Sequence, residues 1–124
     1  KLTEGSKQLI FIYGAPMSIK PFYVKVNPND LSMGLSADLL APEGYGELTT
    51  GGQREDNLDS IVKRIKQEGF DPKDYSWYLD LRKYGSVPHS GFGLGFERMI
   101  RWVCNLDHIR DAIPFPRTMK RSYP

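Results

Sequence analysis

The stretch "SGFGLGFERM" (Ser90–Met99) predicts a strand that runs directly into a helix. Glycine occupies every second position of the strand, at Gly91, Gly93 and Gly95. Side chains of an extended strand alternate between its two faces, so these glycines would share one face and leave it as bare backbone. Such a face admits a flat ligand against the main chain; the alternative is close packing of a neighbouring element.

The helix that follows is predicted over residues 96–106, where apolar side chains recur at helical spacing: Phe96, Met99, Ile100, Val103 and Leu106. Its N-terminus would direct unpaired N–H groups toward the glycine face, which favours an anionic phosphate there. Arg98, on the first turn, adds a planar cation that can stack on a base or bind phosphate oxygens. The glycine spacing is not that of a dinucleotide fingerprint, and the sequence contains no P-loop.

Upstream of this stretch, the sequence predicts strands first and helices afterwards. Strands are expected over residues 7–16, 18–28, 35–42 and 45–50, the last two forming a hairpin around the turn "APEGYG". A helix is expected over residues 56–69, with Asp56 or Asn57 as its cap, and a shorter one over 71–85, with Asp71 as its cap and Pro72 in the first turn. This order indicates an α+β domain in which helices flank an antiparallel β-sheet.

The overall composition limits the class of protein. At 124 residues and 40% hydrophobic content, the chain has the size of one globular domain, and it begins at Lys1 rather than methionine, so we expect a piece of a longer or processed protein. The 17 basic and 15 acidic side chains nearly cancel, so we expect local RNA contacts and no DNA binding. A lone cysteine indicates a reducing compartment, and no apolar run is long enough to cross a membrane, so the cytoplasm is the expected location.

The predicted hairpin carries two carboxylates on adjacent strands, Asp38 and Glu47. Magnesium usually takes one or two protein carboxylates and fills its other positions with water and substrate phosphates, so this pair suits a Mg²⁺–nucleotide site. Thr50 could orient Glu47 or a metal-bound water. The alternative is a solvated acidic surface.

The hairpin ends in "GGQRE", where two glycines bring the backbone close before Gln53 and Arg54. An arginine after such a bend can donate bidentate hydrogen bonds to a carboxylate, or a hydrogen bond to an amide oxygen. The alternative for Arg54 is an ion pair with Glu55 or Asp56.

Three segments carry a family resemblance: "DLLAPEGYGELTTGGQRE", "WYLDLRKYGSVPHSGFGLGFERMI" and "HIRDAIPFPRT". From about Ile10 to its end, the chain resembles the C-terminal part of the catalytic domain of class II aminoacyl-tRNA synthetases. "GFGLGFER" is similar to the third signature motif of that class. "IPFPRT" and the long turn "APEGYGE" favour the archaeal and eukaryotic type of the asparaginyl branch over the aspartyl branch.

The resemblance implies a role for each matching residue on the nucleotide side of the site. Arg98 would bind the triphosphate and adenine of ATP, with Gly93 and Gly95 as the floor of the site. Glu47 and Asp38 would hold Mg²⁺ on the phosphates.

On the amino-acid side, the resemblance implies that Arg54 binds the side-chain oxygen of the amino acid, with Gln53 as a neighbouring wall. His89 would lie beside the same pocket; the alternative is a histidine that orders the turn "VPHSG". Thr50 differs from the small residue expected in many asparaginyl members, and its role is open.

The implied reaction is ATP-dependent activation of asparagine and its transfer to tRNA(Asn) by a homodimer, with no protein nucleophile. The first two class II motifs and the anticodon-binding domain are absent from residues 1–124, so we expect this chain to be inactive alone. An aspartyl-tRNA synthetase, an ammonia-using asparagine synthetase on the same core and a non-catalytic binding module remain alternatives. These residues do not decide between asparagine and aspartate.

Overall fold

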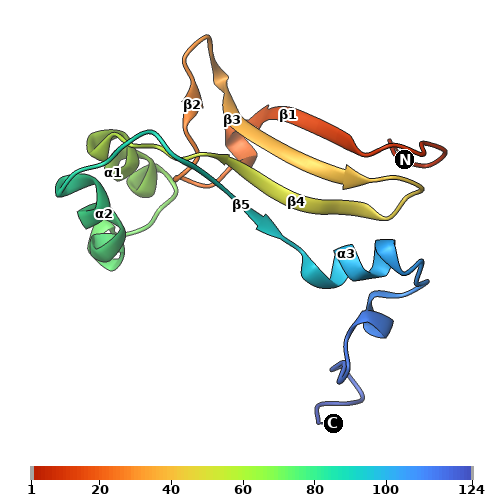
Figure 1. Ribbon diagram of the computed structural model, residues 1–124. Coiled ribbons are helices and arrows are strands. Elements are labelled where there is room, and N and C mark those ends of the chain that lie inside the picture. Colours follow the sequence, from red (N-terminus) through yellow and green to blue (C-terminus); the bar gives the residue numbers. More distant parts are fainter. Residues whose placement is uncertain (1, 124) are drawn as a thin grey trace. The chain divides into compact units, whose positions relative to one another are not determined.

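The computed structural model describes residues 2–123. The strands are β1 (Ile10–Pro16), β2 (Val26–Asn27), β3 (Asp30–Ala41), β4 (Gly46–Gln53) and β5 (Ser90–Leu94), as Figure 1 shows. The α-helices are α1 (Leu58–Gln67), α2 (Ser76–Lys83) and α3 (Phe96–Val103), and the 3₁₀ helices are η1 (Met17–Ile19), η2 (Pro72–Tyr75) and η3 (Ile109–Ala112). The predicted α+β class, an antiparallel sheet with helices, is confirmed.

The five-stranded sheet has the order β1-β3-β4-β5, and β2 pairs with β3. The predicted hairpin is confirmed as β3 and β4, and both strands extend further than expected. Its turn is closed by a hydrogen bond of 3.1 Å from the Tyr45 amide to the Pro42 carbonyl. Glu43 and Gly44 have φ of 55° and 80°, a left-handed conformation that glycine adopts freely.

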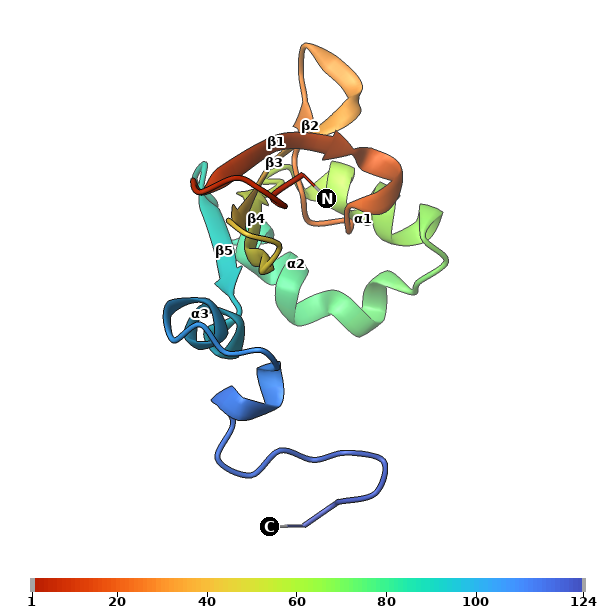
Figure 2. The same ribbon diagram turned by 90° about the vertical axis from the view of Figure 1, so that its right-hand side faces the viewer.

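The chain forms two compact units. The first contains residues 1–12, 38–50 and 93–124, and the second contains residues 13–37 and 51–92. In the second unit α1 and α2 lie side by side (Figures 1 and 2). Ile61 and Ile65 of α1 are fully buried there against Phe22, with Tyr23, Tyr75, Tyr78 and Leu79 around them. Each buried isoleucine stabilises the unit by roughly 1.5–3 kcal/mol.

The strand predicted over residues 18–28 is wrong for most of its length. Its start is the 3₁₀ helix η1, and only Val26 and Asn27 are in a strand. Pro21 has no backbone N–H to donate to a ladder, and Phe22 is 9% exposed in the core of the second unit. Packing of this aromatic residue therefore decides the local backbone more than its strand propensity does.

The predicted helix caps are confirmed. Asn57 caps α1, since its side chain accepts a hydrogen bond of 2.9 Å from the Ser60 amide. The Asp71 side chain accepts one of 2.9 Å from the Lys73 amide, and Pro72 follows it as predicted. The turn after Asp71 is 3₁₀, so the α-helical part of this segment begins only at Ser76.

The helix predicted over residues 96–106 ends earlier, at Val103. Asn105 has a φ of 52°, which a continuing α-helix does not allow. The expected apolar stripe is only partly buried: Phe96 is 62% exposed and Val103 66%, whereas Ile100 and Leu106 are half-buried. Cys104 is also exposed, whereas a cysteine in an apolar pattern is more often buried. Among residues 2–123, the helices are all too short or too polar to cross a membrane.

Candidate active site

Arg98, on the first turn of α3, lies against strand β4. Its Nη1 donates a hydrogen bond of 2.9 Å to the Glu47 carbonyl and lies 3.6 Å from Glu47 Oε1. The start of α3 is joined to the same strand, because the Gly95 amide donates a bond of 2.8 Å to the Leu48 carbonyl. The end of the glycine strand therefore places the predicted nucleotide-binding arginine beside a predicted magnesium ligand.

The glycines near Arg98 differ in what surrounds them. A Cβ at Gly95 would lie 3.0 Å from Arg98 Cδ, so glycine allows this arginine to fold back over its own helix cap. A Cβ at Gly93 would meet nothing within 4 Å. Close packing of a neighbour within residues 2–123 therefore does not account for Gly93, whereas Gly91 and Gly95 each face an arginine side chain.

Glycine has a packing reason at the end of β4. A Cβ at Gly51 would lie 2.7 Å from Phe92 Cβ, and one at Gly52 would lie 2.7 Å from the Leu35 carbonyl oxygen. Both distances are shorter than non-bonded contacts allow. The two glycines thus bring the main chain close to its neighbours immediately before Gln53 and Arg54, as the sequence predicts.

Asp38 and Thr50 are brought together by the hairpin. The Thr50 hydroxyl donates a hydrogen bond of 2.5 Å to Asp38 Oδ1. The sequence predicts that Thr50 orients Glu47 or a metal-bound water. In the structure, the carboxylate that Thr50 contacts is that of Asp38.

The donors on this hairpin fit a magnesium ion that is completed by substrate. No group of three or more His, Cys, Asp or Glu side chains within residues 2–123 could hold a metal ion. Such a group is not needed for Mg²⁺, which usually takes one or two carboxylates and receives its other oxygens from water and phosphate. Asp38 and Glu47 are hard oxygen donors of this kind, and Thr50 adds a hydroxyl beside Asp38.

A cavity of about 420 Å³ opens beside Arg98, lined by Tyr45, Gly46, Glu47, Arg98, Arg101, Asp107, His108 and Ile109. The Arg101 guanidinium lies 5.0 Å from the centre of the Tyr45 ring, and the Tyr45 hydroxyl is 2.5 Å from Asn105 Oδ1. Arg101 lines this cavity and was not predicted from the sequence. Its spacing was a usable signal, because residues three apart share a helix face.

Arg54, in the second unit, is held through both its backbone and its side chain. Its amide donates a bond of 2.9 Å to the His89 carbonyl, and it pairs with Val24 in an isolated antiparallel bridge. Its guanidinium carbon lies 4.8 Å from the centre of the Tyr23 ring. A Cβ at Gly91 would be 3.2 Å from Arg54 Nη2, so this glycine leaves room for the guanidinium.

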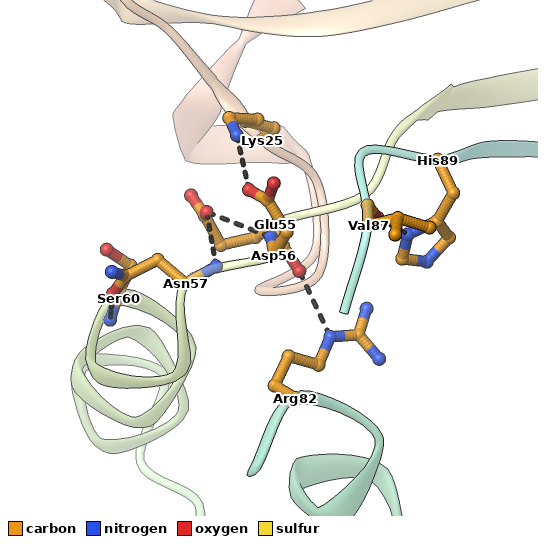
Figure 3. A network of polar contacts seen from close by, with 8 residues as sticks. All are labelled: Lys25, Glu55, Asp56, Asn57, Ser60, Arg82, Val87 and His89. Carbon is orange, nitrogen blue, oxygen red and sulfur yellow. Dashed lines mark hydrogen bonds and ion pairs between the residues drawn. The ribbon is translucent and has the colours of Figure 1, made fainter. Parts of the chain in front are cut away.

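The two acids after Arg54 have other partners, which Figure 3 shows. Within residues 2–123, the contacts of their carboxylates are with these partners and not with Arg54. Asp56 forms an ion pair with Lys25. The Glu55 carboxylate accepts bonds of 3.0 Å from the amides of Asp56 and Asn57. The hydrogen bond from Lys25 holds the pKa of the Asp56 carboxyl below its ordinary value, and the same bond raises the pKa of Lys25.

His89 and Gln53 are both neighbours of Arg54: the His89 carbonyl accepts a hydrogen bond from the Arg54 amide, and Gln53 precedes Arg54 at the end of β4. His89 Nδ1 is 2.8 Å from the Val87 carbonyl oxygen (Figure 3), the turn-ordering contact that the sequence analysis offered as the alternative role. The Gln53 carbonyl accepts a bond of 2.9 Å from the Lys25 amide, at the end of β4. Both residues are therefore neighbours of Arg54, while their predicted contacts with an amino acid remain predictions.

These features agree with the comparison with known proteins. The profile of the family described as tRNA synthetases class II (D, K and N) matches residues 1–119, so the chain belongs to the class II tRNA synthetases. It is 63% identical over 123 residues to the asparagine–tRNA ligase of Pyrococcus abyssi, a match that covers 99% of this chain and 28% of that protein. The chain thus spans less than a third of the relative's length.

Solved structures give the same result. The asparaginyl-tRNA synthetase of Pyrococcus horikoshii, complexed with asparaginyl-adenylate, superposes with a TM-score of 0.95 at 61% identity, covering 99% of this chain and 28% of that chain. The aspartyl-tRNA synthetase of Entamoeba histolytica superposes with a TM-score of 0.85 at 31% identity, covering 94% and 24%. The fold is common to both kinds of enzyme, and the sequence is nearer to the asparaginyl one.

Proposed function

We propose that the full-length protein containing this chain is an asparagine–tRNA ligase, which activates asparagine with ATP and transfers it to tRNA(Asn). The observation that carries the proposal is the 63% identity to an asparagine–tRNA ligase over almost the whole chain. The difference between 61% identity to an asparaginyl and 31% to an aspartyl enzyme structure supports asparagine as the substrate.

In the proposed reaction, the asparagine carboxylate attacks the α-phosphorus of ATP and pyrophosphate leaves. A ribose hydroxyl at the tRNA 3′ end then takes the acyl group from the adenylate and AMP leaves. Neither step needs a protein nucleophile, so the chain's task is to align the reactants and stabilise charge. Arg98 would supply a cation for the polyphosphate or a planar face for adenine, and Gly93 would let the nucleotide lie against the backbone.

Glu47 and Asp38 would hold Mg²⁺, which neutralises charge on the ATP phosphates when it is bound. The contact of Thr50 with Asp38 supports a fixed orientation for that carboxylate. Arg54, over the Tyr23 ring and beside Gly91, would donate to the side-chain oxygen of asparagine. Gln53 and His89 would complete the wall of that pocket.

The remaining parts of the function belong to the longer protein. We place the first two class II motifs, an anticodon-binding domain and the dimer interface in its other segments, and the enzyme in the cytoplasm. On this proposal, residues 1–124 alone do not catalyse asparagine-dependent exchange of pyrophosphate into ATP.

The test is amino-acid-dependent exchange of pyrophosphate into ATP by the full-length protein, with asparagine and aspartate compared, with and without tRNA. Exchange driven by asparagine supports the proposal. Exchange driven by aspartate would move the protein to the aspartyl or asparagine-synthetase alternative, and no exchange with either amino acid would favour a binding module.

A further inference from the structure

Arg82, on α2, is a buried arginine with an unusual set of partners. The residue is 8% exposed. Its Nε donates a bond of 3.1 Å to the Glu55 carbonyl, and its Nη2 donates one of 2.8 Å to the Tyr78 hydroxyl (Figure 3 shows the first). Its guanidinium carbon also lies 4.1 Å from the centre of the Tyr78 ring. Within residues 2–123, its hydrogen bonds go to a carbonyl and a phenol and not to a carboxylate.

Burial of the Arg82 guanidinium is unfavourable in free energy, and its packing contacts alone do not explain why an arginine stands at this position. A guanidinium loses its hydration on burial, and an apolar side chain of similar volume often serves stability equally well or better. The carboxylate of Glu55 accepts hydrogen bonds from the amides of Asp56 and Asn57, and Arg82 bonds to the Glu55 carbonyl instead. What Arg82 fixes is therefore the main chain of Glu55, at its carbonyl.

That carbonyl belongs to the residue directly after Arg54. The rest of the same short connection is also held: the Glu55 amide donates 2.9 Å to the Tyr23 carbonyl, and Asp56 pairs with Lys25. Tyr23 also carries the ring on which the Arg54 guanidinium lies. Arg82 therefore holds a further polar group of the backbone segment that follows Arg54 directly.

We infer that Arg82 is a positioning residue for asparagine: by anchoring the Glu55 carbonyl, it fixes the Arg54 guanidinium between the Tyr23 ring and Gly91. Arg82 does not touch the substrate itself. The inference rests on the proposed function of Arg54. A displacement of about 1 Å at a substrate-binding group can cost up to about a hundred-fold, so loss of the anchor should weaken asparagine use selectively.

The test uses the full-length protein and its pyrophosphate exchange, with KM for asparagine and for ATP measured separately. Arg82→Met should raise the KM for asparagine by about ten-fold or more and change the KM for ATP by less than about two-fold. Arg82→Lys, which keeps the charge and can reach one acceptor, should be intermediate. Lys83→Ala, at the exposed neighbouring position, and the core variant Ile65→Val should leave the ratio of the two KM values unchanged.

A double-mutant cycle with Arg54→Lys tests whether Arg82 acts through Arg54. If it does, Arg82→Met should add little to the asparagine KM once Arg54 has been changed. Additive effects would overturn the inference, as would an Arg82→Met enzyme that melts at a lower temperature and keeps its asparagine KM. An unchanged asparagine KM in Arg54→Lys would instead contradict the proposed role of Arg54, and no asparagine-dependent exchange in the wild type would remove the proposed function and the inference together.

Discussion

Arg98 Nη1 contacts Glu47 twice, at 2.9 Å from its carbonyl oxygen and 3.6 Å from its carboxylate. The two side chains are 52% and 41% exposed, so solvent screens the ion pair and it adds at most about 1 kcal/mol to stability. Its consequence is geometric: a cation and a carboxylate that are 51 residues apart in sequence are held side by side. Loss of either side chain is therefore expected to affect function more than folding stability.

Arg98→Ala should therefore impair the reaction far more than the fold. We expect asparagine-dependent exchange by the full-length enzyme to fall by about 10²- to 10³-fold, because a preorganised cation at developing charge is lost. The thermal midpoint should change little. Arg110→Ala, at an exposed position in η3, is the matched control and should remain active; near-normal exchange in Arg98→Ala would contradict the nucleotide-binding role.

Glu47→Gln keeps the shape of the side chain and removes the charge that would attract Mg²⁺. We expect the Mg²⁺ concentration for half-maximal exchange to rise by about ten-fold or more, since a hard cation binds a neutral amide oxygen more weakly than a carboxylate. Saturating Mg²⁺ should restore part of the rate. The same substitution at the exposed Glu43 of the hairpin turn provides the comparison, and identical Mg²⁺ curves for Glu47→Gln and wild type would refute the assignment.

Gly93→Ala separates ligand binding from packing. A Cβ at this position meets nothing within 4 Å, so the fold should tolerate it, and reduced freedom of the unfolded chain should contribute about 0.4–1 kcal/mol of stability. The KM for ATP should nevertheless rise if the nucleotide lies against this backbone. A stabilised enzyme with an unaltered KM for ATP would show that the open face has another purpose.

The ion pair of Lys25 and Asp56 predicts a definite dependence of stability on pH. The pKa of Asp56 is lowered from 3.8, so the carboxylate's contribution is present above pH 3.8 and is lost as pH falls through its folded-state pKa. The pKa of Lys25 is raised from 10.5, so its contribution is present below pH 10.5 and is lost as pH rises through its folded-state pKa.

Asp56→Asn tests this dependence. The difference in melting temperature between wild type and variant should be constant from about pH 5 to 9 and should shrink in stronger acid. Asp74→Asn, at an exposed position in η2, should show no such shrinkage. A difference that grows below pH 3.8 would reverse the sign assigned to the pair.

Local signals predicted the hairpin, the caps of α1 and η2, and the strand that leads into α3. They failed at residues 18–28, where Phe22 packs into a core formed by helices about forty residues later. The candidate residues were recognisable by type and motif, but their partners were not. No sequence pattern indicated that the Thr50 hydroxyl would donate a hydrogen bond to Asp38 instead of Glu47. None indicated that Arg82 would be buried and bonded to the Glu55 carbonyl, because such pairings depend on tertiary packing.

The clashes that a side chain at Gly51 or Gly52 would cause also limit how the proposed asparagine pocket around Arg54 could be altered. A side chain at either position would enter the space of Phe92 Cβ or the Leu35 carbonyl oxygen. Substitutions of these two glycines therefore cannot change which amino acid the proposed pocket accepts without moving the strands. Substitution of Tyr23, whose ring supports Arg54, would change that support and also the packing around Phe22, Ile61 and Ile65, so the two effects would have to be separated by a measurement of stability.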